Sequence, residues 1–156
     1  MSIAASALAL ARPFEFQGKT LRLHPLTYED LARFSLWLEE RAKAAAFRAI
    51  AAGDAEAKTI YGAFLDRVTS GDFEPGSEVF DRSTRSNAGS RKLLELMLVP
   101  PDSEKAPDAW RSATSWDIYA DAKDFERATM AMQEINSDPL AVRGRRIPAQ
   151  PEAPSR

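Results

Sequence analysis

The chain has 156 residues and a mass of 17.2 kDa, and 44% of its residues are hydrophobic, so one domain with a substantial core is expected. Its net charge of −2, with 28% charged residues, argues against a general nucleic-acid binder, which would carry a large basic excess. The absence of Cys and the single His exclude disulfide scaffolds, Cys-ligated zinc, thiol nucleophiles and any site that needs two imidazoles.

Residues 1–11 form a short apolar stretch whose Ala-x-Ala sequence superficially resembles a signal-peptidase site. No Lys or Arg precedes this stretch, and it is short for the apolar region of a secretory signal. We therefore interpret residues 1–12 as an N-terminal arm. No apolar run in the sequence approaches the ~20 residues that span a bilayer, so no membrane is expected as a partner.

Residues 13–23 alternate between apolar and polar side chains, which is the period of a β-strand with one apolar face. A Gln-Gly-Lys turn interrupts the alternation and predicts a β-hairpin. An isolated hairpin is marginal in water, so we expect the helix that follows to cover its apolar face. The residues expected in the resulting core are Phe14, Phe16, Leu21, Leu23, Leu31, Phe34 and Leu38.

Two consecutive helices are predicted after the hairpin. Thr27 and Asp30 form a capping box, and the Ala-rich sequence predicts a helix over residues 28–52 that ends at Gly53. This helix would be about 37 Å long, so one of its ends is expected to project from a small domain. A second apolar stripe predicts a helix over residues 54–70, antiparallel to the first.

The remaining sequence predicts a long loop and three shorter helices. Residues 72–89 are rich in Ser, Gly and Pro and are interpreted as one loop. Helices are predicted over residues 90–98, 107–114 and 121–136, and residues 137–156 are interpreted as a disordered tail with Pro and Arg. The predicted fold is mainly α: an N-terminal β-hairpin packed on an antiparallel helical domain of about four to five helices, all within residues 13–136.

No constellation for catalysis is apparent in the sequence. His24 has no nearby Ser, Cys or second His, so it predicts neither a triad nor a metal site. Asp117, Asp121 and Asp124 could share a helix face and bind Mg²⁺, but carboxylates near a helix start also act as caps, and the capping role is preferred. We expect no catalytic residues, no metal site and no cofactor.

Four large aromatic residues are candidates for binding a protein partner. Trp residues are enriched at the energetic centres of protein interfaces, although such residues also commonly pack in cores. The candidate partner-binding residues are Trp37, Phe47, Trp110 and Trp116.

The N-terminal block resembles a pattern found in tailed-phage tail-assembly chaperones. The matching sequence is Phe14-Glu-Phe16-Gln-Gly-Lys-Thr-Leu21-Arg-Leu23, followed by Pro-Leu-Thr-Tyr-Glu-Asp30-Leu. A later segment, Lys-Leu-Leu-Glu-Leu-Met-Leu over residues 92–98, is similar to the second, buried helical block of that family. The loop at residues 72–89 has no counterpart in the pattern.

The resemblance implies a non-catalytic protein that keeps the long tape-measure protein soluble during tail assembly. It implies the host cytoplasm as the place of action, with the virion as an alternative, and the tail tube protein as a second candidate partner. Homo-oligomerisation stays open. Two other functions also remain: a virion structural component such as a head–tail connector or tail accessory protein, and a metal-dependent enzyme or regulator that uses Asp117 and Asp121.

Overall fold

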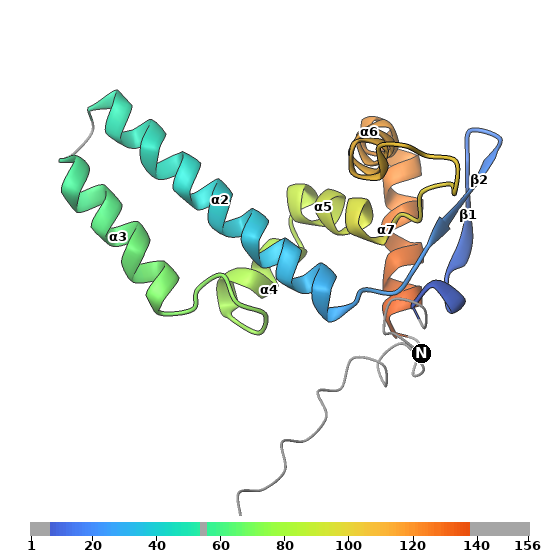
Figure 1. Cartoon of the computed structure of the whole chain (residues 1–156), viewed down its shortest axis with the longest axis horizontal. Coiled ribbons are helices and arrows are strands. Elements are labelled where there is room, and N and C mark those ends of the chain that lie inside the picture. Colours follow the sequence, from blue (N-terminus) through green and yellow to red (C-terminus); the bar gives the residue numbers. More distant parts are fainter. Residues whose placement is uncertain (1–6, 54–55, 138–156) are drawn as a thin grey trace, which may run out of the picture.

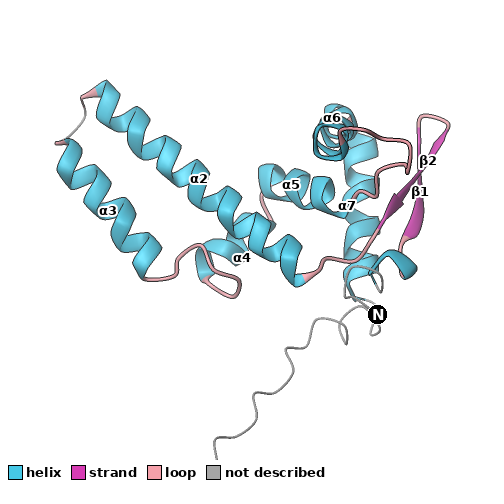
Figure 2. Ribbon diagram, in the orientation of Figure 1, coloured by secondary structure: helices cyan, strands magenta, loops and turns pink. Residues whose placement is uncertain are grey.

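The computed structural model describes residues 7–53 and 56–137 and is mainly helical, with one N-terminal β-hairpin (Figure 1). The elements are β1 (Arg12–Phe16), β2 (Lys19–Leu23), α2 (Tyr28–Ala52), α3 (Ala57–Thr69), α4 (Glu78–Thr84), α5 (Asn87–Met97), α6 (Pro107–Ala120) and α7 (Ala122–Ser137). The predicted fold class is confirmed; the described residues contain the helices α2 to α7 and a helical turn at residues 7–9, which is more than the four to five helices predicted (Figure 2). No helix in these two described ranges is long and apolar enough to cross a membrane.

The predicted N-terminal arm and C-terminal tail each overlap a regular element by one residue. The predicted arm, 1–12, is described from residue 7, where residues 7–9 form a helical turn and Ala7 is buried. Arg12 already belongs to β1. Ser137 is the last residue of α7, and the rest of the predicted tail, 138–156, lies outside the described residues.

The hairpin packs on α7 and not on the first helix as predicted. β1 and β2 pair in antiparallel register around a turn in which both Gln17 and Gly18 have positive φ, the geometry of a tight two-residue hairpin. β1 contacts α7, and the end of β2 is fixed to the segment after α5 by a bridge between Leu23 and Leu98. Residues 24–27 form an irregular connection between β2 and α2, and α2 then runs away from the hairpin (Figure 1).

The first helix has the predicted bounds because its end signals are local. Thr27 and Asp30 form the predicted capping box, and Gly53 ends the helix in a left-handed conformation with φ 74°. Phe34 and Leu38 in its first half are buried, and Phe34 packs edge-on against Phe80 of α4 at 5.1 Å between ring centroids. The second half leaves the body of the molecule together with the antiparallel α3 (Figure 1).

The predicted loop over residues 72–89 is wrong, because it contains α4 and the first residues of α5. The Ser side chains that suggested a loop are helix caps: Ser77 accepts a hydrogen bond from the backbone N–H of Phe80, and Ser86 accepts one from Gly89. Phe80 and Phe73 are both buried, so the segment belongs to the core. α5 therefore begins at Asn87, three residues before its predicted start.

The core lies where α5 meets α6, α7 and the hairpin. Leu94 and Met97 of α5 and Ile118 of α6 are fully buried. α6 continues six residues beyond its predicted end, because Ser115 and Ile118 are buried against its neighbours. Among the residues predicted for the core, the buried ones are Phe14, Phe16, Leu23, Phe34 and Leu38, and the partly buried ones are Leu21 and Leu31.

Candidate functional site

Two of the four candidate partner-binding residues, Trp37 and Trp110, pack against other parts of the chain. Trp37 is half-buried, packs on Phe34 at 5.2 Å and carries the guanidinium of Arg41 over its ring at 4.8 Å. Trp110 is partly buried against the core. Neither ring is free to present a large apolar surface to another protein.

Trp116 is exposed, but its ring supports an internal polar network. The guanidinium of the buried Arg91 lies 4.2 Å from the ring centroid of Trp116. Arg91 also pairs with Glu95 at 2.8 Å and donates a hydrogen bond to Ser115 at 2.8 Å, which ties α5 to α6. Tyr119 packs edge-on against Trp116 at 5.6 Å. Trp116 is therefore a partly structural residue with an outer face in solvent.

Phe47 lies on the projecting part of α2, ten residues after Trp37 on the same helix. We call residues 39–52 of α2 together with α3 the arm. The arm is unusually open: within it, only Phe64 is buried. Phe47 is 51% exposed and packs against Tyr61 of α3 at 6.0 Å. The four candidate residues thus do not converge on one site.

Four exposed apolar residues of α2 and α3 share one flank, three of them in the arm and Leu36 just before it. Leu36 and Phe47 are 11 residues apart, which is about three helical turns, so the two side chains leave the helix in directions that differ by only about 20°. Tyr61 and Leu65 are one turn apart on α3, and the contact between Phe47 and Tyr61 places their faces side by side. We call Leu36, Phe47, Tyr61 and Leu65 the arm patch; they are 61%, 51%, 39% and 44% exposed.

Three of the four arm-patch residues were missed by the sequence reasoning. Tyr61 and Leu65 belong to the apolar stripe that predicted this helix and were not named as binding candidates; only Phe64 at the centre of the stripe is buried. The available signal was the width of that stripe, because α3 packs mainly against α2 and cannot bury a stripe that extends around its side. Leu36 gave a similar signal: it lies between Phe34 and Leu38 in the sequence but on a different side of the helix from these two inward-facing residues.

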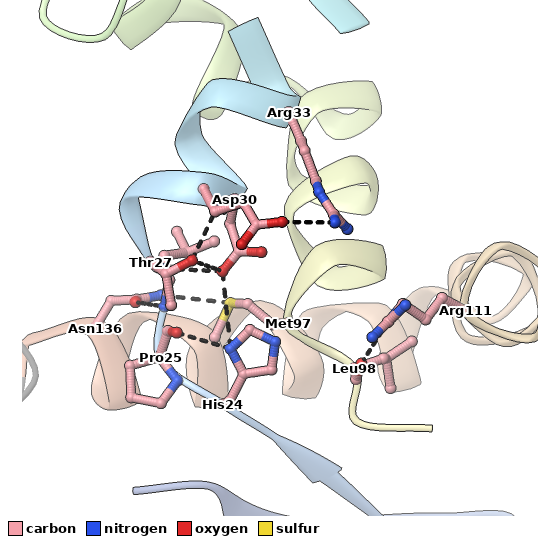
Figure 3. A network of polar contacts seen from close by, with 11 residues as sticks. His24, Pro25, Thr27, Asp30, Arg33, Met97, Leu98, Arg111 and Asn136 are labelled. Carbon is pink, nitrogen blue, oxygen red and sulfur yellow. Dashed lines mark hydrogen bonds and ion pairs between the residues drawn. The ribbon is translucent and has the colours of Figure 1, made fainter. Parts of the chain in front are cut away.

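A polar cleft lies where the start of α2 approaches the end of β2 and α6 (Figure 3). Two hollows of about 180 and 360 Å³ share His24, Asp30, Arg33 and Arg111 as lining residues. Asp30 is buried, and its Oδ2 accepts hydrogen bonds of 2.8 Å from both the backbone N–H and the hydroxyl of Thr27. The carboxylate thus serves primarily as the cap of α2.

The geometry of this cleft differs from that of an acid–base site. His24 Nδ1 lies 2.8 Å from the carbonyl oxygen of Pro25 and 3.8 Å from Asp30 Oδ2. Because a carbonyl oxygen only accepts, Nδ1 carries a proton that is committed to the backbone and not to the carboxylate. Arg111 donates from Nε to the carbonyl oxygen of Leu98 at 2.9 Å. These contacts tie the entrance of α2 to its neighbours, and the hydroxyl of Thr27, which lines the same cleft, donates to Asp30 and not to His24.

The acidic residues at the junction of α6 and α7 act as caps and ion pairs. Asp121 Oδ1 accepts hydrogen bonds from the backbone N–H groups of Lys123 at 2.9 Å and Asp124 at 3.0 Å. Asp124 pairs with Arg127 at 3.0 Å, and Asp117 is exposed. Within residues 7–53 and 56–137, no group of three His, Cys, Asp or Glu residues could hold a metal ion.

Comparison of the chain with models of protein families, with curated proteins and with solved structures gives no match in any of the three.

Proposed function

We propose that this protein is a non-catalytic phage tail-assembly chaperone that binds helical segments of the tape-measure protein through the arm patch. The observation that carries this proposal is the open arm: two long antiparallel helices project from the body with four large apolar side chains exposed along one flank. The resemblance of the N-terminal block to tail-assembly chaperones supports the same role.

The arm patch fits an amphipathic helix as its ligand. With areas of roughly 150–250 Å² for a large side chain, the exposed fractions leave about 350 Å² of apolar surface along the flank. A typical interface buries about 800 Å² per partner, a little more than half of it apolar, so the patch has nearly the required apolar area. Two antiparallel helices with such a flank can accept the apolar face of a third.

The proposal is tested by co-expression with the tape-measure protein, which we expect to be encoded next to this chain as a very long helical reading frame. The soluble fraction of that partner should rise several-fold when the wild-type chain is present. Phe47→Ser combined with Leu65→Ser should remove most of this gain, because both side chains belong to the arm patch. Met130→Ser is the control, because Met130 is an exposed apolar residue on α7, outside the arm patch.

Circular dichroism should show that all the variants remain folded, since every substituted side chain is largely exposed. A partner that is equally soluble without this chain would contradict the chaperone function. In that case a virion structural component, detectable in purified particles, becomes the better proposal.

A further inference from the structure

We infer that two copies of this chain pair through an antiparallel contact between their α2 helices, and that this homodimer covers the arm patch when no partner helix occupies it. The inference shares one premise with the proposed function, namely that the arm is a binding surface. It depends on a pattern in α2 that is symmetric about its own midpoint.

The pattern consists of four residues on one strip of α2. Leu36, Glu40, Lys43 and Phe47 are separated by four, three and four residues, so they lie within about 60° of one another around the helix. We call these residues the α2 strip. Its outer positions are apolar, its inner positions carry opposite charges, and its spacing is the same when it is read in either direction.

An antiparallel pair of such strips is complementary at all four positions. A two-fold axis through the midpoint places Leu36 opposite Phe47 of the other copy, and Glu40 opposite Lys43 of the other copy. The apolar ends then bury one another, and two intermolecular ion pairs form between them. A parallel pair would place Glu40 against Glu40 and is disfavoured by like-charge repulsion.

The charged residues of the α2 strip are available for this contact. Glu40 is exposed and Lys43 is half-buried, and neither makes an ion pair or a side-chain hydrogen bond with any other described residue. They are three residues apart on one helix, yet they do not pair with each other. A foreign helix on this flank forms both ion pairs only if it carries a base opposite Glu40 and an acid opposite Lys43, whereas a second copy supplies both by symmetry.

The surrounding surface has the size that a dimer requires. Phe47 contacts Tyr61, so the flank of α3 continues the α2 strip and the pair would bring four helices together. Each copy would contribute about 350 Å² of apolar side chain, close to the apolar share of a standard interface. The two arms, in each of which Phe64 is the one buried residue, would thereby gain a common interior.

Light scattering after size exclusion tests the pairing with the purified full chain at low ionic strength. The wild-type protein should have twice the 17.2 kDa mass of one chain. Glu40→Lys and Lys43→Glu should each raise the dissociation constant about tenfold or more, because each replaces two attractive pairs by two repulsive ones. The double variant restores opposite charges and should return the dissociation constant to within about threefold of wild type.

Arg48→Glu is the control, because it reverses a charge on the same helix about 110° from the centre of the α2 strip. It should leave the dissociation constant within about threefold of wild type. A wild-type mass of one chain at concentrations up to ~100 μM would overturn the dimer, as would a double variant that fails to dimerise while its circular dichroism is native. Because no tape-measure protein is present, these results stand apart from the co-expression experiment.

Discussion

Substitution of Gly89 by Ala should destabilise the protein far more than a Gly-to-Ala change in a helix normally would. Gly89 is buried in the first turn of α5, where its Cα lies against the last turn of α4. A Cβ atom built at this position would lie 1.8 Å from the carbonyl oxygen of Ser83. Real Cβ atoms keep at least 3.0 Å from other heavy atoms, and Ser83 contributes backbone, which cannot rotate away.

The expected cost is about 3 kcal/mol, the upper part of the range measured for overpacked sites. Moving α4 outward would disturb Phe80, which packs on Phe34 of α2, and would weaken the cap that Ser86 provides for α5. In a chain of this size 1 kcal/mol corresponds to about 2–4 °C in melting temperature, so the midpoint should fall by about 6–12 °C.

Thermal and urea denaturation followed by circular dichroism measure this change. Gly62→Ala is the matched control, because Gly62 lies inside α3 and a Cβ added there would have no heavy atom within 4 Å. Its stability should be unchanged or raised by up to about 1 kcal/mol, as Ala is the better helix former. If Gly89→Ala melted at the same temperature as the control, α4 would not rest on α5 at Ser83 and the reasoning would be refuted.

Three further outcomes are expected. Leu23→Asp should unfold the domain at a cost on the order of several kcal/mol, because Leu23 is fully buried; a native melting curve would place the hairpin outside the core. Arg91→Leu should lower the free energy of unfolding in urea by about 2 kcal/mol, since it removes one of the two cationic partners of Glu95, Lys92 being the other, and leaves Ser115 without its hydrogen-bond donor; an unchanged midpoint would contradict this. Calorimetric titration with Mg²⁺ or Zn²⁺ should detect no binding tighter than ~1 mM, and a micromolar site lost in Asp117→Asn or Asp121→Asn would reopen the enzymatic alternative.

Elements with local end signals could be predicted from the sequence. Thr27 and Gly53 act on the residues next to them, so the bounds of the first helix follow from the chain itself. α4 could not be found in this way, because its seven residues are too few for a periodic signal. Ser and Gly are also common in loops. Only the packing of Phe80 and the close approach at Gly89 show that this segment is a capped helix and not a loop.

The candidate binding surface was less accessible to sequence reasoning, because exposure depends on what a helix packs against. Phe47 was identified as a candidate, whereas Tyr61 and Leu65 were not, because their spacing within an apolar stripe is the same as that of core residues. Trp37 and Trp110 show the opposite error: both are aromatic and large, but the body of the molecule covers much of each ring. A sequence gives the periodicity of a helix, but not the number of its neighbours.

α2 is one continuous hydrogen-bonded helix, but its two halves should differ in amide hydrogen exchange, because only the second half belongs to the open arm. Around Phe34 and Leu38, backbone N–H groups can exchange with solvent only when the core opens, so their protection should approach that of the whole domain. Beyond Leu38 no side chain of α2 is buried, and unravelling from Gly53 costs only the contacts with α3. Protection should therefore fall steeply along a single unbroken helix. The distal arm can then loosen and reorder with each binding event, while the capped start of the helix keeps its place in the domain.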